Sequence, residues 1–168
     1  MTPIVLVGLM GAGKSTIGRL VAEATGRALV DVDVAIADRT GKSVRELWEE
    51  GGEAAYRALE SDEVLRALGR PDVVLAAPGG VVLDPAVRDA LADAFVVWLR
   101  ARPPTLGSRV RTGDHRPLLG ADPTADLAAM ATDRAELYAS VADDIVDTDD
   151  LDAAAAAATI LARLPDRT

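Results

Sequence analysis

The feature that most constrains this chain is a glycine-rich loop directly after a short apolar segment. Residues 8–16 read GLMGAGKST, which fits the pattern G-x-x-x-x-G-K-[ST], and the apolar residues 4–7 precede them. Glycine allows backbone torsions that a Cβ would forbid, so successive N–H groups can turn inward around phosphate oxygens. A helix expected from Lys14 adds the positive end of its dipole. Strand, loop and helix together predict a site for a nucleoside triphosphate.

The polar side chains of this motif have separate expected roles. Lys14 reaches the β- and γ-phosphates, and the Ser15 hydroxyl ligates Mg²⁺. The alternative is a strand–turn–helix corner with a chance lysine, but both the pattern and its flanks favour the phosphate loop. The expected nucleotide-binding residues of the loop are Gly11, Ala12, Gly13, Lys14, Ser15 and Thr16.

Composition excludes several classes of protein. A chain of 168 residues that is 49% hydrophobic has the length and core of one folded domain, so we expect a single domain over 1–168. The absence of cysteine excludes disulfides, a thiol nucleophile and Cys-based zinc sites. A net charge of −9 argues against general nucleic-acid binding. No apolar run approaches the roughly 20 residues that span a bilayer, and the early first strand leaves no room for a signal peptide. We expect a cytoplasmic protein with no membrane partner.

Apolar strands and helices alternate along the chain. The expected strands are residues 4–7, 28–30, 73–77, 95–99 and 145–146. The expected helices are 14–25, 34–40, one opened by a capping box at Ser43 and Glu46, 53–68, one from Asp84-Pro85 to about 92, a short one from Pro103, 124–141 and 151–164. This pattern predicts an α/β fold whose parallel sheet has helices on both faces. Ligands of such sheets bind beyond the carboxyl ends of the strands.

Two of the expected strand ends carry further polar chemistry. Asp31 follows the second strand and is a candidate Mg²⁺ ligand, directly or through water. Asp33 lies two residues on, so in an extended segment it points the same way and suits a substrate hydroxyl. The alternative for Asp33 is the N-cap of a helix from residue 34. After the third strand, Gly79 and Gly80 offer backbone donors to a small polar ligand or form a plain turn.

Several arginines suggest an anionic ligand. Arg57 has Glu60 at i+3 and Glu53 at i−4, which fits either a surface ion-pair ladder or a guanidinium held for bidentate carboxylate recognition. Arg134 is open to the same two interpretations. A basic cluster consists of Arg100, Arg102, Arg109, Arg111 and Arg116. Residues 111–123 are polar, basic and glycine-bearing, as expected of a lid that closes over phosphate. The aspartates of residues 143–152 could bind a divalent ion, but their pattern favours roles as helix caps and solvated surface groups.

In their order and spacing these residues resemble the shikimate kinase family, over residues 4 to about 164. The matching pieces are residues 8–16, 31–33, 40–43, 52–60, 79–80, 116–119, 134–138 and 147–148. The resemblance implies a P-loop fold of the nucleoside-monophosphate-kinase type, with a five-stranded parallel sheet in the order 2-3-1-4-5. It also implies transfer of the ATP γ-phosphoryl group to the 3-hydroxyl of shikimate, in aromatic amino-acid biosynthesis.

The resemblance also implies roles for individual residues. Asp33 contacts the shikimate hydroxyls, Arg57 and Arg134 bind its carboxylate, and Gly79 and Gly80 lie along its ring. Arg109 stacks on adenine, with Arg111 as a nearby competitor, and Arg116 of the lid reaches the transferring phosphate. Catalysis is expected from Lys14, Asp33 and Arg116, with one Mg²⁺ ion per subunit held by Ser15 and Asp31. The substrate-binding helical region covers about 33–62 and the lid about 111–123.

Three residues depart from the family pattern. Pro78 stands where a glycine is usual, and Trp48 and Tyr56 stand where phenylalanine is common. Proline removes a backbone donor, and the aromatic changes alter the volume and polarity of the pocket. The expected partners are ATP and shikimate, bound by a monomer. The alternatives are another hydroxy-acid kinase, such as a gluconate kinase, and a nucleotide-binding homologue without turnover.

Overall fold

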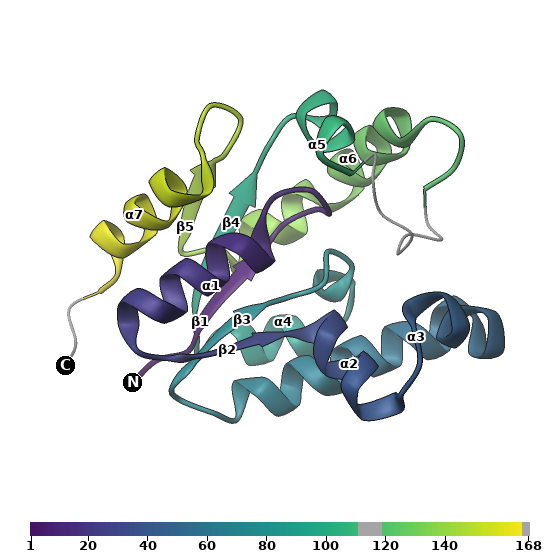
Figure 1. Cartoon of the computed structure of the whole chain (residues 1–168), viewed down its shortest axis with the longest axis horizontal. Coiled ribbons are helices and arrows are strands. Elements are labelled where there is room, and N and C mark those ends of the chain that lie inside the picture. The colour runs from purple at the N-terminus through teal and green to yellow at the C-terminus, as the bar shows by residue number, and fades with distance from the viewer. Residues whose placement is uncertain (111–118, 166–168) are drawn as a thin grey trace.

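A parallel five-stranded sheet forms the centre of the protein (Figure 1). A computed structural model describes residues 1–110 and 119–165. The strands lie in the order β2-β3-β1-β4-β5, which confirms the expected fold and strand order. Their bounds are β1 (Ile4–Val7), β2 (Ala28–Asp31), β3 (Val73–Ala76), β4 (Phe95–Arg100) and β5 (Asp144–Asp147).

Helices cover both faces of the sheet. The α1 and α7 helices pack together on one face, and α3, α4 and α6 lie on the other (Figure 1). The helices are α1 (Lys14–Thr25), α2 (Val32–Thr40), α3 (Val44–Leu68), α4 (Pro85–Leu91), α5 (Pro103–Val110), α6 (Pro123–Val141) and α7 (Ala153–Arg163), with a 3₁₀ turn, η1 (Val81–Leu83), after β3. All residues of β1 and β3 are buried, as expected of strands covered on both faces.

The N-cap of the helix after β2 is a different residue from the one considered in the sequence analysis. The Asp31 side chain accepts hydrogen bonds from the backbone N–H groups of Asp33 and Val34, so Asp31, not Asp33, is the N-cap of α2. The helix therefore begins at Val32, and Asp33 lies in its first turn. Asp33 does not lie in an extended segment as expected, because the backbone is already helical there.

The α3 helix joins two segments that the sequence suggested separately. Ser43 and Glu46 form the expected capping box at its start, and Gly69 caps its end. Gly52 interrupts the helical geometry with φ 76° and ψ −179°, a conformation that only glycine adopts readily. The helix changes direction at this interruption. The second segment contains Arg57 and Glu60, which lie at the carboxyl edge of the sheet.

The aspartates near the C-terminal strand serve local structure. Asp152 caps α7, and Asp144 forms an ion pair with Arg163. Among residues 1–110 and 119–165, no group of three or more acidic, cysteine or histidine side chains is arranged to hold a metal ion. Within the same ranges, each helix is too short or too polar to cross a bilayer.

Candidate active site

A cavity of about 720 Å³ opens at the carboxyl ends of β1, β2 and β3. It brings together residues that the sequence singled out separately, from the phosphate loop, from α2, α3 and α6, and from the turn after β3. The predicted site residues that line it are Gly11, Gly13, Lys14, Ser15, Thr16, Asp31, Asp33, Arg57, Gly79, Gly80, Arg109 and Arg134. The predicted Ala12 is buried within the loop instead, with 1% of its surface exposed.

The phosphate loop has a geometry that requires glycine. Gly8, Gly11 and Gly13 have φ values of 141°, 83° and 95°. A Cβ on Gly8 would collide with the Leu99 carbonyl oxygen at the end of β4. Lys14 Nζ donates to the carbonyl oxygens of Gly8 at 2.8 Å and Leu9 at 3.0 Å, so the ammonium group lies across the loop. The loop thus presents backbone N–H groups and one cation to the cavity.

Ser15 and Asp31 meet at the edge of the phosphate loop. The Ser15 hydroxyl donates to Asp31 Oδ2, while Asp31 Oδ1 accepts from the start of α2. A hydroxyl and a carboxylate oxygen beside a phosphate site are the donors that Mg²⁺ uses, since this ion takes one or two protein oxygens together with substrate phosphates. The residues present therefore fit the expected metal.

Arg57 and Glu60 form an ion pair inside the cavity wall. Arg57 Nη1 donates to Glu60 Oε2 at 2.7 Å, and only 5% of the Glu60 side chain is exposed. This burial distinguishes the pair from a surface ladder, although the other member of the expected ladder, the exposed Glu53, also lies within ion-pair distance of Arg57. Burial raises the pKa of Glu60, and the Arg57 charge opposes that rise. Within the described ranges, the buried Nη2 atom of Arg57 has no hydrogen-bond partner. The Nε atom makes no hydrogen bond either, but it lies 3.7 Å from Glu53 Oε1, within ion-pair distance. Nη2 is therefore the donor that remains for a ligand.

Arg134 lies in the same wall, on α6. It is 8% exposed and lines the cavity, close enough to Glu60 and Tyr138 to affect the pKa of each. The Tyr138 hydroxyl donates to the Gly79 carbonyl at 2.6 Å, and burial raises its pKa to about 12. Two arginines from different helices therefore converge beside the turn after β3, which the sequence alone left open.

The glycine pair after β3 makes room for neighbouring groups. A Cβ on Gly80 would collide with the Arg57 guanidinium, and one on Gly79 would lie 3.2 Å from the Gly8 carbonyl oxygen. Glycine at these positions lets Arg57 and the phosphate loop approach the turn closely. The plain-turn interpretation is thus incomplete, because the missing side chains shape the cavity wall.

Tyr56 is a polar site residue that sequence reasoning treated only as a change in pocket lining. Its hydroxyl donates to Asp33 Oδ1 at 3.1 Å, and the residue is 3% exposed. Trp48 lies beside it, with ring centroids 5.9 Å apart. Burial and the Asp33 charge raise the pKa of Tyr56, so the phenol stays protonated and acts as a donor. One oxygen of Asp33 is therefore engaged by the protein.

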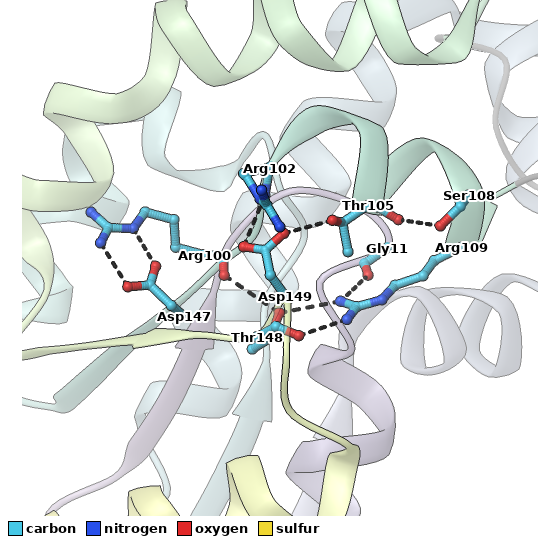
Figure 2. A network of polar contacts seen from close by, with 9 residues as sticks. All are labelled: Gly11, Arg100, Arg102, Thr105, Ser108, Arg109, Asp147, Thr148 and Asp149. Atoms are coloured by element: carbon cyan, nitrogen blue, oxygen red, sulfur yellow. Dashed lines mark hydrogen bonds and ion pairs between the residues drawn. The ribbon is translucent and has the colours of Figure 1, made fainter.

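The basic cluster divides between structure and site. Arg100 and Arg102 pair with Asp147 and Asp149, so these two are not free for an anionic ligand (Figure 2). Arg109 reaches the cavity. Arg111, Arg116 and most of the expected lid lie outside the described residues, which resume at 119.

Comparison with known proteins identifies the family. The family model for shikimate kinase matches residues 10–165. The shikimate kinase of Xanthomonas euvesicatoria pv. vesicatoria (strain 85-10) is 42% identical over 163 residues, covering 96% of this chain and 91% of that protein. That of Mycobacterium bovis (strain BCG / Pasteur 1173P2) is 44% identical over 161 residues, covering 95% and 92%.

Solved structures agree with the sequence relatives. The shikimate kinase from Acinetobacter baumannii in complex with shikimate superposes with a TM-score of 0.92 at 33% identity, covering 96% of this chain and 91% of that one. A gluconokinase from Sinorhizobium meliloti 1021 reaches a TM-score of 0.61 at 22% identity, covering 96% and 92%, and so shares the fold alone. The protein described here belongs to the shikimate kinase family.

Proposed function

We propose that this shikimate kinase transfers the γ-phosphoryl group of ATP to the 3-hydroxyl of shikimate within the cavity at the sheet edge. One observation carries the proposal at residue level. The buried Nη2 atom of Arg57 has no hydrogen-bond partner among the described residues, and Arg57 lines the same cavity as Arg134 and the phosphate loop. A carboxylate accepts such a donor, and a planar guanidinium suits bidentate recognition.

The nucleotide side of the cavity binds and orients the triphosphate. Backbone N–H groups of Gly11 and Gly13 and the first turn of α1 surround its phosphates. Lys14 exchanges its carbonyl partners for phosphate oxygens and screens their charge. Arg109 lies against the base, and Arg116 of the proposed lid adds positive charge at the transferring group. Phosphoryl transfer depends chiefly on such positioning and charge stabilisation.

Ser15 and Asp31 hold the Mg²⁺ ion in this proposal. Their contact supplies the hydroxyl and carboxylate oxygens that the ion requires. When bound, the ion neutralises charge on the β- and γ-phosphates. Asp31 also caps α2, so the same side chain fixes the position of Asp33.

The acceptor side orients the attacking hydroxyl. Arg57 and Arg134 fix the shikimate carboxylate, and Gly79 and Gly80 leave room for the ring. Asp33 accepts a hydrogen bond from the 3-hydroxyl and receives its proton as the bond to phosphorus forms. Tyr56 already occupies one Asp33 oxygen, which leaves the other for the substrate. Holding the carboxylate at one end and the hydroxyl at the other places the nucleophile in line.

We further propose that the protein acts as a cytoplasmic monomer, with the acceptor region over residues 33–62 and the lid over 111–123. The support for a monomer is that residues of this one chain line the phosphate, metal and acceptor parts of the cavity.

The test is ADP release from ATP and Mg²⁺ with a panel of acceptors, followed by phosphorus NMR of the product. We expect shikimate to be preferred over quinate, gluconate and nucleoside monophosphates, with the phosphate on the 3-oxygen. Lys14→Ala is the control for contaminating kinases and should lower turnover about 10²-fold or more, the scale of losing a preorganised charge. Equal turnover with gluconate, or phosphate on another hydroxyl, would overturn the acceptor assignment.

A further inference from the structure

The loop between β5 and α7 contacts both ends of α5 through two consecutive residues (Figure 2). Thr148 reaches Arg109 near the end of α5, and Asp149 reaches Arg102 and Thr105 at its start. Thr148 is 2% exposed, and the Asp149 side chain is 13% exposed. The loop is therefore well placed to fix the position of this short helix.

At the end of α5, Arg109 is held in a defined place. Its guanidinium donates to the Thr148 carbonyl at 2.7 Å, to the Thr148 hydroxyl at 3.2 Å and to the Gly11 carbonyl at 3.3 Å. Thr148 in turn donates its backbone N–H to the Arg100 carbonyl at 2.8 Å, which continues the β4–β5 pairing. Arg109 thus joins the phosphate loop to the edge of the sheet.

At the start of α5, Asp149 serves as a cap from a distant part of the chain. Its carboxylate accepts from Thr105 Oγ1 at 2.6 Å, from the Arg102 backbone N–H at 3.1 Å and from Arg102 Nε at 3.2 Å. The Thr105 hydrogen bond, followed by those of Arg102, lowers the pKa of Asp149, so the carboxylate is charged at neutral pH. A negative charge at a helix start is favourable, because the helix dipole is positive there.

The body of α5 lies directly against the phosphate loop. A Cβ on Gly11 would meet the Leu106 carbonyl oxygen and Val110 Cγ1, each at 2.9 Å. A shift of α5 would therefore move Arg109 relative to the loop. Such a shift would change the distance between the proposed binding position of the base, at Arg109, and that of the phosphates, in the loop.

We propose that Asp149 is a positioning residue for the nucleoside part of ATP. It fixes the start of α5, so that Arg109 at the other end stands at the base while the phosphates lie in the loop. The proposal rests on the proposed role of Arg109 in the nucleotide site. It separates the two parts of the ligand: Asp149 supports the binding of base and ribose, and the phosphates bind without its help.

The test compares two probes by calorimetry in the absence of shikimate: ADP, which has a base, and tripolyphosphate, which has none. Asp149→Asn should weaken ADP binding about fivefold, within the range for coupled residues of one network, and leave tripolyphosphate binding unchanged. The matched control is Asp147→Asn, which breaks the neighbouring exposed pair with Arg100 and should change neither affinity. Thr105→Val removes a single hydrogen bond to Asp149 and gives the same pattern at smaller size, even if Asp149→Asn folds poorly.

A double-mutant cycle decides whether Asp149 acts through Arg109. Arg109→Ala should weaken ADP as well, and adding Asp149→Asn to it should cause little further loss. Additive losses, equal losses of ADP and tripolyphosphate, or no loss of ADP would each overturn the positioning role. A failure of the acceptor assignment would appear instead as a wild-type protein that binds ADP normally and does not phosphorylate shikimate.

Discussion

Two arginines in one cavity differ in how the protein treats their donors. On the nucleotide side, Arg109 donates to Gly11 and Thr148, so the guanidinium is partnered before any ligand binds. On the acceptor side, Arg57 is largely buried, but not all of its nitrogens are hydrogen-bonded. Its Nη1 donates to Glu60, its Nε lies 3.7 Å from Glu53 Oε1, and its buried Nη2 has no hydrogen-bond partner among the described residues.

The difference indicates that the two sides of the cavity bind their ligands in different ways. A buried donor without a partner costs about 1–3 kcal/mol, which a well-placed carboxylate relieves on binding. If Arg57 binds the acceptor as we propose, this side of the cavity selects for an acid, because a ligand without a carboxylate leaves that cost in place. The nucleotide side relies on a preorganised frame, whose contacts need little rearrangement.

Among substitutions on the acceptor side of the cavity, Arg57→Lys should cause the largest loss. Lysine keeps a positive charge near Glu60 but lacks the planar fork, so kcat/KM for shikimate should fall roughly 10- to 100-fold, the value of one or two charge-assisted hydrogen bonds. Affinity for ADP should stay the same. Steady-state kinetics and calorimetry measure the two effects.

The matched control is Arg66→Lys on the same helix, where the exposed side chain pairs with Asp62. This substitution should leave both constants within about twofold, as surface ion pairs contribute little. An equal loss of ADP and shikimate affinity in Arg57→Lys would mean that the two sides of the cavity are not separate.

Tyr56→Phe should have an intermediate effect. The change removes only the hydroxyl that donates to Asp33, so the carboxylate loses one fixed contact. We expect kcat to fall about threefold with KM for ATP unchanged, the scale of a single hydrogen bond. If KM for shikimate rose while kcat stayed constant, Tyr56 would shape the pocket and not orient Asp33.

Glu60→Gln should have the smallest effect, visible in the pH dependence of stability. Because burial raises the Glu60 pKa in the folded state, the folded protein holds this proton more tightly than the unfolded chain. Its stabilising contribution is complete below the unfolded value of 4.5 and is lost as pH rises through the higher folded value. The free energy of unfolding of wild type, measured against Glu60→Gln by urea titration, should therefore fall from pH 4 toward neutrality.

The control is Asp62, whose pKa is shifted in the opposite direction, so that its contribution to stability changes with pH in the opposite sense. Hydrogen bonds from Arg66 and Arg39 lower the pKa of Asp62 on the same helix. The wild type should accordingly gain stability relative to Asp62→Asn as pH rises through the carboxyl range, by a small amount because the pair is exposed. Identical slopes for the two variants would contradict the burial argument for Glu60.

Local signals predicted the elements that depend on neighbouring residues. The bounds of β1 and α1 agree with the sequence prediction, as do the Ser43–Glu46 capping box and the Asp84-Pro85 helix start. Each is set by contacts within a few residues, so the pattern contains the needed information. The predicted start of α2 was wrong because Asp31 and Asp33 are both suitable N-cap residues. Which of them caps the helix depends on the backbone conformation.

Burial and long-range contacts account for what the sequence left open. Arg57–Glu60 and Arg66–Asp62 are both helical pairs at short spacing, yet the first is largely buried, with Arg57 against Gly80 in the turn after β3, while the second is exposed. Spacing cannot distinguish them, because burial depends on which elements pack outside the helix.

The phosphate loop, the alternation of strands and helices, and the set of residues at the strand ends could all be predicted from the amino-acid sequence. These follow from local backbone preferences and from hydrophobic periodicity. Three features appear only in the folded structure: Tyr56 donates to Asp33, the buried Nη2 of Arg57 has no hydrogen-bond partner among the described residues, and Asp149 caps α5. Such contacts join residues 23 to 47 positions apart or depend on burial, so they exist only once the sheet order has brought distant segments together.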